Sequence, residues 1–375
     1  MKKHFLYTLF LVTVILFLCT CRDPIYYYIS QEEELLEPLI KGSPTNFVNF
    51  NGNMYVASGA NLYKYHGTNH DTNMGIWTDI RLSGNIFSLT VAGGRMYALC
   101  QSPNRKVLMV SDDAVNWYAL TETGNHNVQI VYEANDMLFI ATGEIGSYNI
   151  FVYDGAGNLR EIANVGYNLL TGAAFDGTYY YLTTKDMISG YGGFIYSITE
   201  TGLVSGRATA LDHANPYTGI INTGSVIYTI TRNGSLYIVS NNAIYIVTGI
   251  TLNGRLATGA LGIWEDKEDS DSNKMLLAGR QDTLGSSFRS GYTFGYMEAP
   301  LDASGNIAGN FDEPGKFYPS TVNVGDHGRF ISTIGKYPVN HFFQADDGIL
   351  FASTQQNGVW SYRWRKSGKI WNAEE

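Results

Sequence analysis

The chain has 375 residues, of which 45% are hydrophobic and 16% are charged. This apolar content is sufficient for a large core and excludes a disordered chain. The net charge of −9 is not accompanied by a basic stripe that could neutralise phosphates, so nucleic acid is not an expected partner. Many Gly and Tyr residues and few Pro residues favour short strands joined by tight turns, which predicts an all-β fold.

The first 20 residues have the pattern of a secretory signal peptide. Lys2 and Lys3 form a positive start, and the apolar stretch Phe5–Leu18 follows without an acidic residue. An uncleaved membrane helix is the alternative. We favour the signal peptide because the 17 residues from Phe5 to Cys21 are at the short limit of the roughly 17–25 that a membrane helix needs.

The signal ends in the motif Leu18-Cys19-Thr20-Cys21, which resembles the lipobox of bacterial lipoproteins. Thr20 stands where this pattern usually has Gly, Ala or Ser, and the relaxed form is most similar to that of spirochaetal lipoproteins. The resemblance implies cleavage between Thr20 and Cys21, and attachment of acyl chains such as palmitate to Cys21. Two or three acyl chains would hold the protein at a lipid bilayer. Residues 21–43 would then form a lipidated tether, and residues 44–375 the folded domain.

The range 44–375 contains an internal repeat, in which a turn dipeptide precedes a short apolar strand. Seven copies occur, spaced by 42 residues early in the chain and by 74 between the last two. A period of about 40–50 residues, with several short strands in each unit, predicts a β-propeller of seven four-stranded antiparallel blades. The equivalent positions are Tyr55, Tyr97, Phe139, Tyr181, Tyr228, Leu277 and Phe351.

Glycine-containing turns recur between the copies of this repeat, and we expect them to join the two outer strands of each blade. Glycine supplies the positive φ that a two-residue hairpin needs. These turns contain Gly157, Gly202, Gly254, Gly305 and Gly368.

The second blade has a different sequence at this corner, Ser111-Asp112-Asp113-Ala114-Val115-Asn116-Trp117. It resembles the Asp-box of sialidase-like β-propellers, with Ala114 in place of the usual Gly. The resemblance implies that Ser111 and Asp113 hydrogen-bond the backbone of the turn and that Trp117 packs between sheets. An Asp-box is a structural corner, so the motif indicates no catalytic role.

An acidic run from Glu265 to Asn273 contains a weak candidate for a metal site. Asp269, Asp271 and Asn273 have the spacing of the first three ligands of a calcium loop. However, Lys274 and Arg280 stand where such a loop requires Gly and Glu. A solvated hairpin is the favoured interpretation, and neither a metal nor another cofactor is expected.

The interval of 74 residues, compared with 42 in the early blades, implies an insertion of about 30 residues within the range 281–341. Long, aromatic and glycine-rich insertions on a rigid scaffold often carry a binding site. Two longer strands with a loop of no function are the alternative, and the sequence does not decide between them. The candidate binding residues are Phe288, Arg289, Tyr292, Phe294, Tyr296, Phe317 and Tyr318.

Common catalytic motifs such as Gly-x-Ser-x-Gly, His-Glu-x-x-His and the Walker loop do not occur in the sequence. The expected innermost strands, including residues 47–50, 87–90 and 342–345, would line a mostly uncharged funnel. We therefore interpret the protein as a membrane-anchored propeller that binds a protein or a glycan and is not an enzyme.

The chain resembles small treponemal lipoproteins with a leader and a Tyr-rich body. This resemblance implies a surface adhesin for a host matrix protein such as fibronectin. A periplasm-facing scaffold for envelope assembly is the alternative, and a degenerate hydrolase or lyase is the third hypothesis. The expected location is the bacterial cell envelope. Arg22 after Cys21 favours the outer membrane over the inner membrane.

Overall fold

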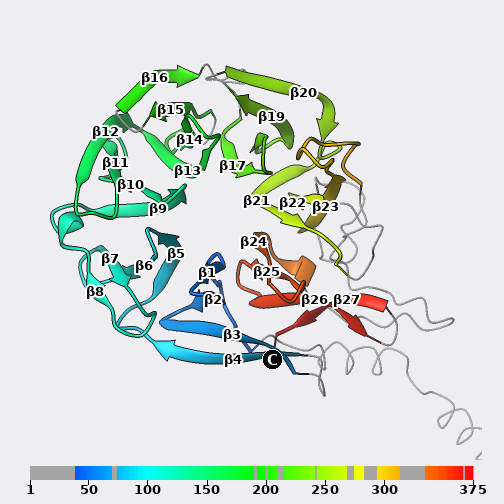
Figure 1. Cartoon of the computed structure of the whole chain (residues 1–375). Helices are drawn as coiled ribbons and strands as arrows, with labels where there is room; N and C mark the ends of the chain where they lie inside the picture. Colours follow the sequence, from blue (N-terminus) through cyan, green and yellow to red (C-terminus); the bar gives the residue numbers. More distant parts are fainter. Residues whose placement is uncertain are drawn as a thin grey trace, which may run out of the picture.

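The computed structural model describes residues 39–69, 74–189, 192–199, 202–208, 215–240, 243–267, 274–282, 294–312, 334–365 and 368–374. Within these ranges the chain forms a ring of seven antiparallel sheets without an α-helix (Figure 1). The seven-bladed β-propeller predicted from the repeat is therefore confirmed. The strands of each blade are consecutive in the chain, and the first of them lies nearest the axis.

The first blade contains β1 (Val48–Phe50), β2 (Asn53–Ser58), β3 (Asn61–Asn69) and β4 (Met74–Arg81). The second contains β5 (Ile86–Ala92), β6 (Arg95–Gln101), β7 (Lys106–Ser111) and β8 (Tyr118–Ala119), followed by the 3-10 helix η1 (Thr121–Thr123). The third contains β9 (Val128–Ala134), β10 (Met137–Thr142), β11 (Tyr148–Tyr153) and β12 (Leu159–Gly166). The fourth contains β13 (Asn168–Phe175), β14 (Tyr180–Asp186), β15 (Ile195–Thr199) and β16 (Gly202–Ala208).

The fifth blade contains β17 (Tyr217–Asn222), β18 (Ile227–Thr231), β19 (Ser235–Ser240) and β20 (Ala243–Thr251). The sixth contains β21 (Leu256–Trp264), β22 (Met275–Gln281) and β23 (Phe294–Pro300). In place of a regular fourth strand it has two isolated bridges, Leu301 to Ile307 and Glu298 to Asp312. The seventh follows the 3-10 helix η2 (Ile334–Lys336) and contains β24 (Val339–Gln344), β25 (Leu350–Thr354), β26 (Val359–Arg365) and β27 (Gly368–Ala373).

The repeat found in the sequence is the second strand of each blade. β2, β6 and β10 each contain at least four consecutive buried residues. The sheets stand side by side around the axis, so a second strand is covered on both of its faces by neighbouring blades. Tyr97 of β6, for example, packs edge-on against Tyr153 of the next blade, with ring centroids 6.4 Å apart. This burial explains why the repeat is a continuous apolar run and not an alternating pattern.

The two faces of the ring are defined by the direction of the strands. We call the face at which each innermost strand begins the upper face. Because the strands alternate in direction, the upper face also carries the turn between the second and third strands of each blade and the connection to the next blade. The opposite, lower face carries the turns between the first and second strands and between the third and fourth strands.

The ring closes between the seventh and first blades without exchanging a strand. Residues 39–43 instead lie against the seventh blade. The N–H of Val359 donates to the carbonyl of Ile40 at 3.1 Å, and the N–H of Gly358 donates to the carbonyl of Gly42 at 3.0 Å. Ile40 is fully buried in the same apolar cluster as Val359. We call residues 39–43 the strap. They belong to the folded body, which therefore includes residues before 44, the position at which the propeller was expected to begin.

A buried ion pair completes this closure. Glu374 follows β27 and is 0% exposed, and its carboxylate accepts hydrogen bonds from Arg363 at 3.0 and 3.2 Å. The same carboxylate accepts the N–H of Gly75 at 3.0 Å and the indole N–H of Trp77 at 2.8 Å, both from β4 of the first blade. We call this set of contacts the closure seam.

One of the glycine turns is placed differently from its expected position. Asn253 and Gly254 lie between β20 and β21, so they connect the fifth blade to the sixth and do not join two outer strands. Both have positive φ values, 49° and 75°. A tight reversal needs this backbone conformation wherever it occurs, so the Asn-Gly pair could not distinguish a hairpin from a link between blades.

Candidate functional site

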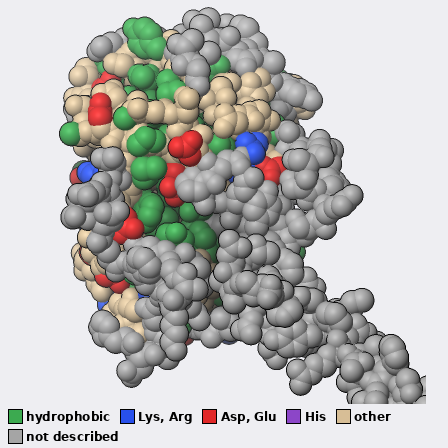
Figure 2. Space-filling model, turned by 90° about the vertical axis from the view of Figure 1, so that its right-hand side faces the viewer, with side chains coloured by type: hydrophobic (Ala, Val, Ile, Leu, Met, Phe, Trp, Pro, Cys, Tyr) green, Lys and Arg blue, Asp and Glu red, His purple; other side chains and the backbone are tan. Residues whose placement is uncertain are grey.

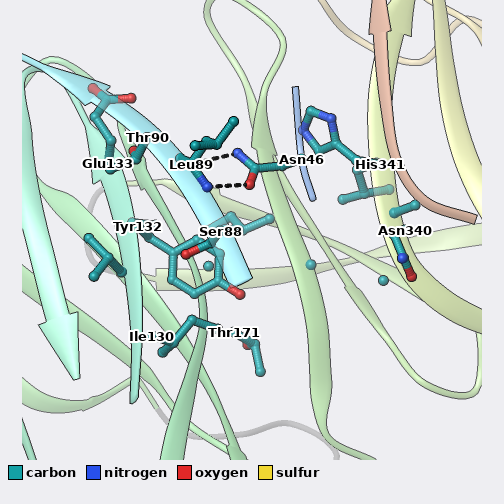
Figure 3. A pocket seen from close by; sticks show the side chains of 18 of the residues that line it. Asn46, Ser88, Leu89, Thr90, Ile130, Tyr132, Glu133, Thr171, Asn340 and His341 are labelled. Atoms are coloured by element: carbon teal, nitrogen blue, oxygen red, sulfur yellow. Dashed lines mark hydrogen bonds between the residues drawn. The ribbon is translucent and has the colours of Figure 1, made fainter. Parts of the chain in front are cut away.

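A channel runs along the axis of the ring, and residues from all seven innermost strands line it. Its volume of about 750 Å³ is in the range of small-molecule sites. Figure 3 shows Ser88, Tyr132 and Thr171 around the channel on one side and Asn340 and His341 on the other.

The wall formed by β13, β17 and β21 is rich in small residues because these strands approach each other closely. A Cβ atom on Gly172 would lie 2.6 Å from the side chain of Ile220, and one on Gly219 would lie 2.4 Å from the carbonyl oxygen of Gly259. Any larger residue at Gly172 or Gly219 would force the blades apart. These glycines are therefore explained by packing between blades, without a ligand.

Several polar groups of the channel are bonded to the scaffold itself. The Asn46 amide spans two blades, because it accepts the N–H of Leu89 at 3.0 Å and donates to the carbonyl of Leu89 at 2.6 Å (Figure 3). The hydroxyl of Thr258 donates to the carbonyl of Val339 at 3.0 Å, again across two blades. Much of the hydrogen-bonding capacity of the lining thus holds the innermost strands together.

Besides Tyr132, the channel lining contains two ionisable side chains, Glu133 and His341, on opposite sides in Figure 3. Burial raises the pKa of Glu133, partly offset by the N–H of Asp136, which donates to its carboxylate at 2.9 Å. Burial lowers the pKa of His341 to about 4, and its Nδ1 accepts the N–H of Phe47 at 3.3 Å. The imidazole is therefore neutral at neutral pH and is used in a contact between the seventh and first blades.

The corner that resembles an Asp-box brings Ser111, Asp113 and Trp117 together. One carboxylate oxygen of Asp113 accepts the N–H groups of Val115 and Asn116 at 2.8 and 2.7 Å, and the hydroxyl of Ser111 donates to it at 3.0 Å. These hydrogen bonds, of which the one from the Asn116 N–H has the largest effect, hold the pKa of Asp113 well below its usual range. The indole N–H of Trp117 donates to the carbonyl of Ala114 at 3.1 Å, and the ring packs on the core between the first two blades.

The candidate binding insertion falls into two connections. One runs from β22 to β23, and the other from Asp312 to η2; the described residues at their ends lead to the upper face. Phe294 is half-buried at the start of β23. Tyr296 is only 2% exposed and packs against Phe342 and Trp371, so its assignment to a binding surface was wrong. The aromatic pattern could not separate a strand residue from a loop residue. Phe288, Arg289, Tyr292, Phe317 and Tyr318 lie outside the described residues.

Other candidates also lie outside the described residues, namely Thr20 and Cys21 of the lipobox and Asp269, Asp271 and Asn273 of the acidic run. Across the part of the chain that the structure describes, no three His, Cys, Asp or Glu side chains form a metal-binding group. No helix within those same ranges is long and apolar enough to cross a membrane.

The lower face is acidic, a feature that the sequence analysis missed. Counting turns and the two strand residues on either side, the described side chains include eleven carboxylates and four bases. The carboxylates are Asp112, Asp113, Glu133, Asp136, Asp154, Asp176, Glu265, Asp266, Asp302, Asp346 and Asp347, and the bases are Arg95, Arg160, Lys267 and Lys274. The carboxylates are spread over 236 positions, from Asp112 to Asp347, so only the alternation of strand direction reveals that they share a face.

The upper face has the opposite charge balance. By the same count, and leaving out the buried Arg280 and Glu374, seven bases and five carboxylates are described there. The bases are Lys41, Arg81, Arg105, Lys106, Lys185, Arg232 and Arg255, and the carboxylates are Glu122, Glu144, Asp186, Asp282 and Asp312. On the side of the ring that Figure 2 shows, the described surface carries both apolar and acidic side chains.

Several lower-face carboxylates are held in place by their own turns. Asp154, Asp176 and Asp302 each accept a backbone N–H two residues further along the chain, at 2.8, 2.8 and 2.9 Å. Hydrogen bonds lower the pKa of Asp154, chiefly from the Asn158 side chain, and of Asp302, chiefly from the Asn306 backbone. Asp154 and Asp302 are therefore ionised, and all three carboxylates are oriented before any partner arrives.

Comparison with known structures shows that the chain has a β-propeller fold and assigns it to no family. No family model matches the chain, and no curated protein matches its sequence. Among solved structures, a streptogramin B lyase superposes with a TM-score of 0.55 at 9% identity, over 86% of this chain and 94% of the other. Virginiamycin B lyase from Staphylococcus aureus gives 0.54 at 12% identity, over 86% and 96%. The WD40 propeller domain of Doa1 gives 0.54 at 9% identity, over 89% and 97%. At these identities the likeness concerns the fold alone.

Proposed function

We propose that this protein is a recognition propeller, held at a bacterial envelope membrane by an acylated Cys21, whose lower face binds a partner with a basic surface. The observation that carries the proposal is the excess of carboxylates on the turns of that face, eleven against four bases. An oriented field of one sign accelerates encounter with an oppositely charged partner and disfavours other partners.

The proposed role in the cell is that of a surface adhesin, with a host matrix protein such as fibronectin as the partner. The lipobox and the Tyr-rich propeller body support this role by resemblance. The β-propeller fold, which presents many loops on one rigid frame, is suited to binding a protein.

Binding of immobilised fibronectin tests this proposal directly. We expect the variant Asp154→Asn/Asp176→Asn/Asp302→Asn to bind about tenfold more weakly at low salt, because three charges are lost while an acceptor oxygen remains in each turn. The matched control, Asp79→Asn/Glu144→Gln/Glu161→Gln, removes three exposed charges away from the turns of the lower face and should bind as the unmodified protein does. Equal binding by both variants would contradict the proposal that the lower face binds the partner.

Location is tested by protease treatment of intact cells, with a periplasmic protein as the control for leakage. Rapid loss of the propeller while the control survives supports the adhesin role. Protection until the envelope is broken overturns that role and leaves the periplasm-facing scaffold.

A further inference from the structure

The upper face exposes most of the large apolar side chains that remain on the described surface. Ten such residues are exposed, and six of them are on the upper face: Leu39, Phe87, Ile145, Tyr167, Ile188 and Tyr337. Val115 is on a lower-face turn, and the other three are on outer strands. Exposed apolar residues that gather on one face usually mark an interaction surface.

Three of the six residues form a continuous ridge across the third and fourth blades. Ile145, Tyr167 and Ile188 are 59%, 49% and 63% exposed. The N–H of Met187, next to Ile188, donates to the carbonyl of Tyr167 at 3.0 Å. A Cβ on Gly146, next to Ile145, would lie 2.9 Å from the Tyr167 ring. We call these three residues the upper ridge.

The upper ridge is presented by turns that are bonded internally. Ile145 is in a turn closed by the N–H of Ser147, which donates to the carbonyl of Glu144 at 2.9 Å. The carboxylate of Asp186 accepts the N–H of Ile188 at 2.8 Å. Positions that are usually polar in tight turns therefore hold isoleucines whose side chains are exposed to solvent.

Basic groups share the upper face with these apolar residues. The face carries seven bases against five carboxylates, although the whole chain has a net charge of −9. The ammonium of Lys106 lies 4.7 Å from the centre of the Phe87 ring at the mouth of the channel. Apolar and aromatic side chains beside Lys and Arg are the combination that binds the headgroup region of an anionic bilayer.

The N-terminal part of the chain enters the ring at the upper face. The strap begins at Leu39, whose N–H donates to the carbonyl of Glu374 at the upper end of the seventh blade. Residues 1–38 therefore join the ring at its upper face. The 18 residues from Cys21 to Leu39 can span at most about 65 Å when fully extended. An anchor at Cys21 would keep this face near the bilayer.

From these observations we infer that the upper face docks on an anionic lipid surface, with the upper ridge entering the headgroup region. The part of this inference that concerns orientation in the cell rests on the proposed anchoring at Cys21. The contact itself does not, because it is made by the folded body. The docked propeller presents its acidic lower face away from the membrane, where a partner can reach it.

The test uses residues 39–375, which contain all the described strands, the strap and the closure seam. This body is sedimented with phosphatidylcholine vesicles, with and without about one third phosphatidylglycerol. We expect binding to the anionic vesicles that weakens with salt, and a loss of about tenfold or more in the variant Ile145→Asp/Ile188→Asp. Val115→Asp is the matched control, because Val115 is also 59% exposed but lies on the lower face; it should bind as the unmodified body does.

Absence of vesicle binding, or an equal loss in the Val115→Asp control, overturns the inference. The inference is also overturned if the upper ridge binds a protein but does not bind anionic vesicles. Because the body lacks Cys21, its result does not depend on acylation. Failure of the anchoring proposal, seen as absence of acyl groups on the mature protein by mass spectrometry, is therefore distinguished from failure of the docking contact.

Discussion

Two carboxylates in this propeller accept similar sets of hydrogen bonds but stabilise very different parts of it. Glu374 is fully buried in the closure seam and binds Gly75 and Trp77 of the first blade, 299 and 297 positions away. Asp113 is at an exposed corner and binds Val115 and Asn116, two and three positions away. The first carboxylate holds the ring closed, whereas the second holds one turn.

The difference shows where the stability of a ring without strand exchange is concentrated. A turn that loses its cap can fray while its blade stays packed. The seventh and first blades, in contrast, are joined by the strap, the buried ion pair and a few inner contacts such as that between His341 and Phe47. We therefore expect the effects of substitutions to decrease from the closure seam to the corner.

The largest effect is expected from Arg363→Met. This change leaves the Glu374 carboxylate buried without its cation, and breaking a buried pair in this way costs about 3–5 kcal/mol of unfolding free energy. Urea unfolding measures the loss, with Arg232→Met, at an exposed position, as the control. The double variant Arg363→Met/Glu374→Gln should recover part of the loss because it removes the unpaired charge. A loss no larger than that of the control would contradict the importance of the closure seam.

His341 should make the inner contact between the seventh and first blades sensitive to acid. Its pKa is about 4 in the folded protein against 6.5 for an unperturbed histidine, so the folded state binds fewer protons between these values. The associated stability is present above pH 6.5 and is lost as the pH falls to 4, by up to about 3 kcal/mol. Unfolding free energies measured across this range check the slope. His341→Gln keeps an acceptor for the Phe47 N–H and should flatten it, and an unchanged slope would falsify the assignment.

Gly75→Ala should weaken the closure seam by sterics alone. The added Cβ would lie 2.1 Å from Oε2 of Glu374 and 2.5 Å from the indole nitrogen of Trp77, so the carboxylate and the ring must move. Overpacking of this kind costs about 1–3 kcal/mol. Thermal unfolding compares this variant with Gly309→Ala, where the nearest atom is at an ordinary 3.4 Å. Equal melting temperatures for the two variants would show that the contact is not tight.

The smallest effect is expected from Asp113→Ala. The variant loses the bonds to Val115 and Asn116, but these bonds lie within one exposed turn. Its melting temperature should therefore fall less than that of any closure-seam variant. Asp113→Asn, which keeps an acceptor oxygen, should fall less still. A larger fall for Asp113→Ala than for Arg363→Met would reverse the comparison between the two carboxylates.

The sequence analysis identified the strands that are covered on both faces, but it misplaced two residues whose local pattern fits more than one place in the fold. Residues such as Tyr97 and Phe139 were recognised because a doubly covered strand requires a short apolar run that recurs in every blade. Gly254 was placed in an outer hairpin and Tyr296 in a binding loop, although the first links two blades and the second is buried. In both cases the local signal was real, but it was compatible with more than one place in the fold.

The sequence alone determined the number of blades and the strands of their cores, because burial of a strand and reversal at a turn depend on residues near each other in the chain. Only the tertiary structure decided how the ring closes and what each face presents. Glu374 meets Gly75, and the carboxylates from Asp112 to Asp347 reach one face, because alternating strands arranged in a circle bring distant turns together. No local pattern encodes these contacts, since each residue involved is ordinary for the turn or strand end that carries it.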